Sequence, residues 1–227
     1  MVHFCVLAKW ARVSLGALAV GMAFASVGYA ATETDSAAAQ QAEQAPVAIN
    51  GFRSATFGMD KAAVIAAITK DFGLTEADIA QGQNTVERTE LLTVKVPDLL
   101  EGGGTAQVSY IFGYTSKALI QVGASWNATI DPAMTDAQLV ANSDVLGSHF
   151  AAGNYAPGSL TAATAVENGI LLFRGLDPEG RSAILLLQGN YEEDTNGRNA
   201  LKPTGLALLY SVNPDTPDIF RIKDGNF

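Results

Sequence analysis

The sequence predicts an α+β protein in which an antiparallel sheet carries two main helices on one face. Three observations favour this class: two well-capped amphipathic helix patterns, several strand-like apolar runs after each pattern, and connections too short for parallel crossovers. Hydrophobic residues make up 48% of the 227-residue chain and charged residues only 16%, so a sizeable core can form.

The first helix pattern begins after Asp60, whose side chain suits an N-cap. Met59 before it and Val64 after it have the spacing of a hydrophobic staple. Apolar residues then recur at helical spacing, and Gly73 is expected to end the helix. The apolar face consists of Val64, Ile65, Ile68 and Phe72. A short further turn is expected to begin at Thr75.

The second helix pattern has the same design. Thr135 suits the N-cap, and Gln138 would complete a capping box with it. Met134 and Leu139 repeat the staple, and Gly153 is expected to end the helix. The predicted buried face consists of Leu139, Val140, Leu146 and Phe150.

Strand-like runs follow each helix pattern. They cover residues 91–96, 106–112 and 118–126 after the first helix, and 170–173, 183–188, 206–212 and 219–222 after the second. The run Ile184–Leu187 is apolar on both faces, which predicts a central strand covered on both sides. Helix and hairpin thus occur twice, which suggests two pseudo-repeats at 49–130 and 131–227 within a single α+β domain, 49–227.

Residues 1–30 have the order of a secretory signal peptide. Lys9 and Arg12 precede an uncharged apolar run, and a site of small residues follows it. We predict cleavage between Ala30 and Ala31, which would place the protein in a periplasm or outside the cell. Residues 31–48, rich in alanine, glutamine and glutamate, are predicted to be a disordered linker.

An uncleaved inner-membrane anchor is the alternative, because Val13 to Ala31 holds no charge and has about the minimum length that spans a bilayer. After cleavage no membrane span would remain. The only cysteine, Cys5, would leave with the leader, so the mature chain would have no disulfide, thiolate nucleophile or cysteine-based zinc site.

The formal net charge of −9 argues against two classes of partner. Nucleic acids and anionic lipids both require clustered lysine or arginine to replace counterions. An acidic surface repels them, so we expect no nucleic-acid binding.

The segment Phe52–Met59 (FRSATFGM), which runs into the first helix, resembles the opening of uncharacterised bacterial exported proteins. More loosely, the helix-then-sheet repeat resembles the modules of beta-lactamase-inhibitor-like and small outer-membrane-assembly lipoproteins. The first resemblance implies no activity, and the second implies a binding or assembly module. The chain lacks the cysteine anchor of those lipoproteins after its leader.

Little catalytic chemistry is visible. His149 is the only histidine left after cleavage and has no nucleophile or metal motif beside it, so we expect a half-exposed structural histidine. The loop Glu192–Gly197 places oxygen ligands before a glycine, but Pro203 stands where a calcium loop needs a glutamate. We expect a solvated turn there, with weak calcium binding as the alternative. No cofactor or metal is predicted.

Other polar residues have structural explanations or suggest a binding surface. The carboxylates of Asp131, Asp136, Asp177 and Glu179 suit turns or helix starts. The candidate binding residues are Trp126, Tyr155 and Arg174, because tryptophan and arginine are favoured where partners bind. Packing at the edge of the core is the alternative for each.

The sequence therefore predicts a non-enzymatic exported protein that binds an unknown protein or small ligand in the cell envelope, or helps to organise the envelope. An unfamiliar periplasmic hydrolase that uses carboxylates or serine is the alternative.

Overall fold

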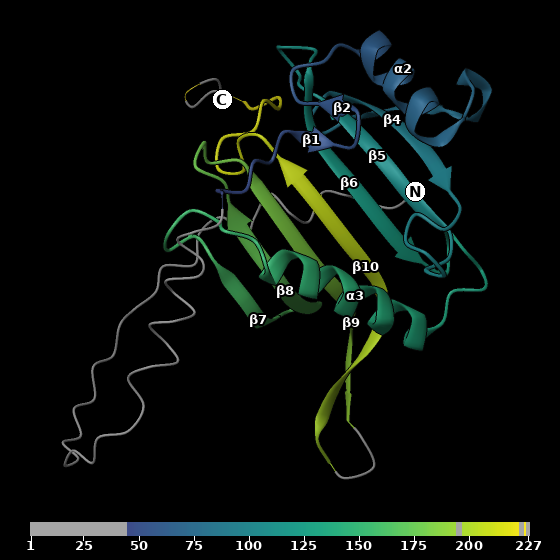
Figure 1. Cartoon of the computed structure of the whole chain (residues 1–227), viewed down its shortest axis with the longest axis vertical. Coiled ribbons are helices and arrows are strands. Elements are labelled where there is room, and N and C mark those ends of the chain that lie inside the picture. The colour runs from purple at the N-terminus through teal and green to yellow at the C-terminus, as the bar shows by residue number, and fades with distance from the viewer. Residues whose placement is uncertain (1–44, 194–196, 223–224, 226–227) are drawn as a thin grey trace, which may run out of the picture. The chain divides into compact units, whose positions relative to one another are not determined.

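Eight antiparallel strands form one sheet, and two helices lie on one of its faces (Figure 1). This computed structural model describes residues 45–193, 197–222 and 225. The strand order is β3-β4-β5-β6-β10-β9-β8-β7, and each neighbouring pair is antiparallel. The edge strands β3 and β7 do not pair with each other, so the sheet is open.

The chain builds this sheet in two similar halves. A short ribbon comes first, formed by β1 (Gly51–Phe52) and β2 (Ala55–Thr56). The first half contains α2 (Lys61–Phe72), the 3₁₀ turn η2 (Glu76–Asp78), β3 (Ala80–Asn84), β4 (Thr89–Val96), β5 (Ala106–Phe112) and β6 (Leu119–Asn127). The second contains α3 (Asp136–Ala151), β7 (Thr161–Val166), β8 (Gly169–Leu176), β9 (Ser182–Glu193) and β10 (Asn199–Ser211).

Each half is thus a helix followed by a four-stranded meander, and the halves meet where β6 pairs with β10. The predicted α+β class, antiparallel sheet and two helices are confirmed. The repeat of helix and strands is present as well, with four strands after each helix.

Both helices begin at the predicted caps. The Asp60 carboxylate accepts from the Ala63 N–H at 2.8 Å, and Gly73 ends α2 in the left-handed region with φ of 67°. The Thr135 hydroxyl accepts from the Gln138 N–H at 3.2 Å. The predicted capping box of α3 is wrong, however, because the Gln138 side chain donates instead to the carbonyl of Gly102.

Two further expectations are corrected. Val140 was expected on the buried face of α3, but its side chain is 41% exposed. Residues 219–222 do not form a strand; there the Phe220 N–H donates to the Glu87 carbonyl across a loop. The sequence also gave no sign of the edge strands β3 and β7, whose residues are mostly exposed and lack apolar alternation.

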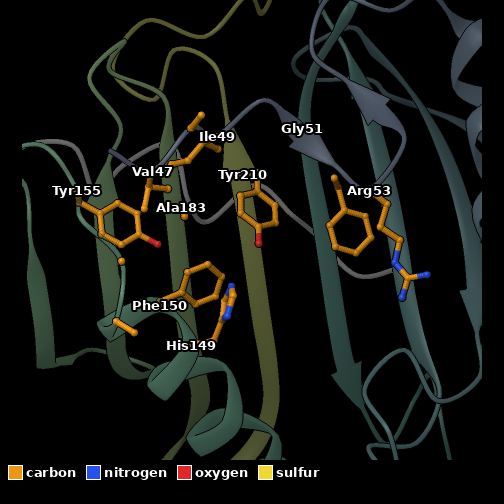
Figure 2. Close-up of a pocket in the computed structure, with 13 residues that line it drawn as sticks. Val47, Ile49, Gly51, Arg53, His149, Phe150, Tyr155, Ala183 and Tyr210 are labelled. Carbon is orange, nitrogen blue, oxygen red and sulfur yellow. The ribbon is translucent and has the colours of Figure 1, made fainter. Parts of the chain in front are cut away.

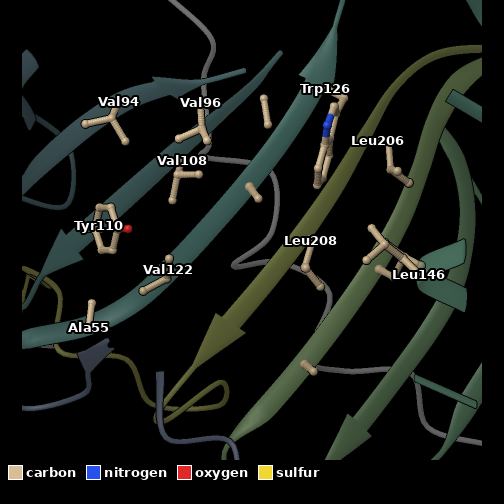
Figure 3. Packing of buried hydrophobic residues seen from close by; sticks show 14 of the residues in the cluster. Ala55, Val94, Val96, Val108, Tyr110, Val122, Trp126, Leu146, Leu206 and Leu208 are labelled. Atoms are coloured by element: carbon tan, nitrogen blue, oxygen red, sulfur yellow. The ribbon is translucent and has the colours of Figure 1, made fainter. Parts of the chain in front are cut away.

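The core lies between the helices and one face of the sheet. Cross-strand partners on this face share one row, formed by Leu92, Tyr110, Val122, Tyr210 and Ala183. Figure 3 shows members of this core projecting from β4, β5, β6 and β10. Strand β9 was expected to be covered on both sides. Leu185 and Leu187 are buried on the helix face, whereas Ile184 and Leu186, on the other face, are only half-buried.

The described part of the chain contains no helix that is long and apolar enough to cross a membrane.

Candidate functional site

A cavity of about 560 Å³ opens on the helix face of the sheet, beside the C-terminal end of α3 (Figure 2). Its size lies within the range of small-molecule sites. Three parts of the chain form it: residues 47–53, the end of α3 with the loop that follows, and strands β9 and β10. The lining residues are Val47, Ala48, Ile49, Gly51, Phe52, Arg53, His149, Phe150, Ala152, Gly153, Tyr155, Ala183 and Tyr210.

Residues 46–50, here called the strap, form one wall through Val47, Ala48 and Ile49, and are held by hydrogen bonds to distant parts of the chain. The Val47 N–H donates to the Asn154 carbonyl at 2.9 Å. The Ile49 N–H donates to Oδ2 of Asp177 at 2.9 Å. Because Ile49 is 4% exposed, the strap is anchored by packing as well as by these bonds.

Asp177 is the buried anchor of the strap. Its side chain is fully buried and also accepts from Nε of Arg181 at 2.7 Å. Burial alone would raise the pKa of the Asp177 carboxyl, but the hydrogen bonds from Ile49 and Arg181 hold it below its usual value. The same carboxylate accepts from the Glu179 and Arg181 N–H groups, so the predicted turn role of Asp177 is confirmed.

The β1–β2 ribbon continues the strap and needs glycine at its first position. Gly51 has φ of 144°, and a Cβ there would collide with the Ala55 carbonyl oxygen. Arg53 follows in the tight turn with φ of 53°. Its guanidinium lies 4.8 Å from the centre of the Phe72 ring, and Figure 2 shows it directed away from Tyr155 and Tyr210.

Aromatic rings form a connected part of the apolar surface around the cavity. The Phe150 ring stacks on Phe173 at 5.2 Å between centroids and lies 6.2 Å from the ring of Tyr210. Tyr210 is also 6.1 Å from Phe52, and Tyr155 is 4.9 Å from Phe173. This network fixes the position of both tyrosines.

The hydroxyls of Tyr155 and Tyr210 are the notable polar groups. Neither has a hydrogen-bond partner among the described residues. Burial raises the pKa of Tyr155 to about 12. Burial, together with the nearby Tyr155, raises the pKa of Tyr210 to about 12. Both phenols are therefore protonated at neutral pH and can each donate a hydrogen bond.

His149 adds a third polar side chain. It is exposed, lies edge-on to Phe150 at 5.2 Å between ring centroids, and lines the cavity from the last turn of α3. The sequence predicted a half-exposed structural histidine at the border of the apolar face. The contact with Phe150 fits that border position. The sequence did not predict that His149 also lines a cavity.

The three predicted binding residues do not come together. Tyr155 lines the cavity. Trp126 is 1% exposed and packs in the core, so it offers no surface to a partner. Arg174 lies on β8 opposite Ile184, on the face of the sheet that the helices leave uncovered.

Sequence reasoning missed Phe52, Arg53 and Tyr210 as cavity residues. Tyr210 has a visible signal, since strand spacing places it on the same face of β10 as the buried Leu206 and Leu208. The pairing of the strap with Asp177 has none, because it joins residues that are 128 positions apart.

The predictions about metal binding and leader cleavage are addressed only where they fall on described residues. Among residues 45–193 and 197–222, no group of three or more histidine, cysteine or acidic side chains gathers as a metal site would. In the proposed calcium loop, residues 194–196 lie outside the described part, and Glu192 pairs with Lys202 at 3.7 Å.

The predicted cleavage site at Ala30 and Ala31 also lies outside the described residues. Asp131 accepts from the Thr105 and Ala133 N–H groups, as its predicted turn role requires.

The cavity lining determines which chemistry it can support. It contains no aspartate, glutamate, serine, threonine, cysteine or lysine side chain. Its polar side chains are the imidazole of His149, the guanidinium of Arg53 and the phenols of Tyr155 and Tyr210, set in a mainly apolar lining. No family model, curated protein or solved structure matches the chain.

Proposed function

We propose that the protein is a non-enzymatic binding module of the cell envelope, and that the cavity beside α3 holds a small ligand. One observation carries this proposal: an aromatic-lined cavity of about 560 Å³ contains two tyrosine hydroxyls without partners in the described chain. Small-molecule sites combine a mainly apolar lining with a few convergent polar groups, as this cavity does.

The envelope location rests on the N-terminal sequence. The charged start, apolar run and small-residue site of residues 1–30 direct the chain to export. The two-part fold would also suit the resemblance to beta-lactamase-inhibitor-like modules, which act by binding. The lining favours binding over the alternative of hydrolysis, because it supplies no carboxylate or serine.

Blocking the cavity tests this function. Ala48 and Ala152 are exposed residues that line the cavity, so Ala48→Trp or Ala152→Trp would fill it with little cost to the core. Ala151 is exposed, adjoins Ala152 and does not line the cavity, so Ala151→Trp is the matched control.

The measurement is a thermal-shift screen of a small-molecule library on the whole chain, expressed with its own N-terminal segment. We expect compounds that raise the Tm of the unaltered protein and of Ala151→Trp, but not of Ala48→Trp or Ala152→Trp. If the same compounds stabilise all four proteins equally, the cavity is not the binding site and the proposal fails. Turnover of a hydrolase substrate that both blocking variants abolish would replace it with the enzymatic alternative.

A further inference from the structure

We propose that the ligand of this cavity is a small organic acid, with its carboxylate between Tyr155, Tyr210 and His149 and its apolar body against the aromatic wall. This inference rests on the proposed function and specifies the chemistry of that site. It follows from which polar groups the cavity contains, and which it lacks.

The first step is the pair of phenols. Figure 2 shows the hydroxyls of Tyr155 and Tyr210 in the same cavity, with His149 and Phe150 of the last turn of α3 beside them. A phenol O–H donates one hydrogen bond, and an ionised carboxylate accepts about four. Two donors without acceptors in the described chain are therefore matched by an acceptor-rich group on the ligand.

The second step is the charge of the lining. The protein as a whole has a formal net charge of −9, yet no acidic side chain lines this cavity. A cationic ligand would normally be paired with carboxylates. Here the polar side chains of the lining are an imidazole, a guanidinium and two phenols, all of which can donate.

The third step separates a carboxylate from a phosphate. Phosphate sites usually combine several cationic groups or a cradle of backbone N–H groups. The guanidinium of Arg53 is directed away from the tyrosines, towards the Phe72 ring 4.8 Å away. What remains beside the phenols is one imidazole, which suits a singly charged acid.

The fourth step concerns the body of the ligand. Phe52, Phe150 and Tyr210 form a connected aromatic surface, with centroid distances of 6.1 and 6.2 Å to Tyr210. Val47 and Ile49 of the strap provide aliphatic surface within the same lining. A flat aromatic or branched aliphatic body would bury its surface there.

Three probes with the same aromatic body and similar size test the inference by isothermal titration calorimetry on the whole chain: 2-naphthoate, its neutral amide 2-naphthamide, and the cation 2-naphthylmethylammonium. We expect the naphthoate to bind about tenfold or more tightly than the amide, and the cation most weakly, because charge-assisted hydrogen bonds are the stronger ones. Tyr155→Phe and Tyr210→Phe should each weaken naphthoate binding by about five- to tenfold.

Two controls accompany these variants. Tyr114→Phe removes a phenol outside the cavity, where the ring meets Phe220, and should leave all three affinities unchanged. Both tyrosine variants should weaken binding of the amide clearly less than binding of the naphthoate, since a neutral carbonyl accepts weaker hydrogen bonds than a carboxylate.

The outcomes separate this inference from the proposed function. If the amide binds as tightly as the naphthoate, and Ala48→Trp abolishes both, the cavity binds ligands but the acid inference is overturned. If the naphthoate binds equally to Ala48→Trp and to both phenylalanine variants, it binds elsewhere and both proposals fail for this probe. If no probe binds the unaltered protein, the acid inference is wrong, and the thermal-shift screen alone decides the proposed function.

Discussion

The backbone N–H of Ile49 donates to the buried carboxylate of Asp177 at 2.9 Å, across 128 positions of the sequence. This one hydrogen bond ties the strap before the first strand to the turn between β8 and β9. The wall of the cavity therefore depends on a contact between the start of the folded region and a turn in its second half. A substitution that removes the hydrogen bond between Ile49 and Asp177 should release the strap from the cavity before it affects the pairing of the strands.

Replacing Asp177 by asparagine should destabilise the protein at pH 7 by about 2–3 kcal/mol, because charge-assisted bonds to Ile49 and Arg181 are lost in a buried place. Urea denaturation measures this difference. Asp144→Asn, at an exposed position of α3, should change stability by less than about 0.5 kcal/mol.

The same carboxylate gives a pH dependence. Its pKa in the folded protein lies below the unfolded value of about 3.9, so it contributes stability above that pH. That contribution is lost as the pH falls through the lower, folded-state pKa. The unaltered protein should therefore lose more stability than Asp177→Asn between pH 5 and pH 3. Equal losses in the two proteins would show that Asp177 is not held ionised by the fold.

Local features of the fold were readable from the sequence, and long-range ones were not. The caps at Asp60 and Thr135 are short-range patterns, and both helices begin there. The edge strands β3 and β7 were not predicted, because an exposed edge strand does not need alternating apolar residues. In the site, the sequence predicted Tyr155 as a binding residue. Its position beside the strap depends on packing between distant residues, for which the sequence has no local signal.

Two glycines at the end of α3 should respond in opposite ways to alanine. Gly147 lies inside the helix, and a Cβ there meets nothing within 4 Å, so Gly147→Ala should stabilise the protein by about 0.5–1 kcal/mol. At Gly153 a Cβ would lie 2.6 Å from Cε2 of Tyr155 and 2.8 Å from Cγ2 of Val47.

Gly153→Ala should therefore cost about 1–3 kcal/mol and displace either the strap or the tyrosine ring. Thermal denaturation measures the stability of each variant, and calorimetric titration with 2-naphthoate measures whether the cavity still binds its ligand. A Gly153→Ala protein with unchanged stability and unchanged affinity would mean that Gly153 does not pack closely against Tyr155 and Val47.

Tyr110 contains a buried hydroxyl that the fold leaves without a partner among the described residues. The side chain is 0% exposed, and burial raises the pKa of its phenol. Tyr110→Phe removes the unsatisfied group and keeps the ring, so we expect a gain of about 1 kcal/mol in the free energy of unfolding. The half-buried Tyr114 provides a control, since Tyr114→Phe should leave stability within about 0.5 kcal/mol. A clear loss of stability in Tyr110→Phe would indicate a hydrogen bond that the fold does not reveal.

The proposed export predicts a defined N-terminus for the protein isolated from its native cells. Mass spectrometry of the intact protein should give a mass that lacks residues 1–30, with Ala31 as the first residue. Replacing Ala30 by a bulky residue such as glutamine should block cleavage and leave the longer chain attached to the membrane fraction. Protein that retains Met1 and is recovered from the cytosol would contradict the envelope location.

The raised pKa values of the two phenols make a prediction about binding at high pH. Tyr155 and Tyr210 titrate near pH 12 rather than near the usual 10, so their protonated, donating forms persist through pH 10. Naphthoate affinity should therefore change by less than about twofold between pH 8.5 and 10, and should fall only as the pH rises towards 12. Ordinary phenols would already be half ionised at pH 10, and their negative charge would repel the carboxylate. An affinity that falls with a midpoint near pH 10, and does so less steeply in Tyr155→Phe, would mean that these hydroxyls are not buried in the cavity.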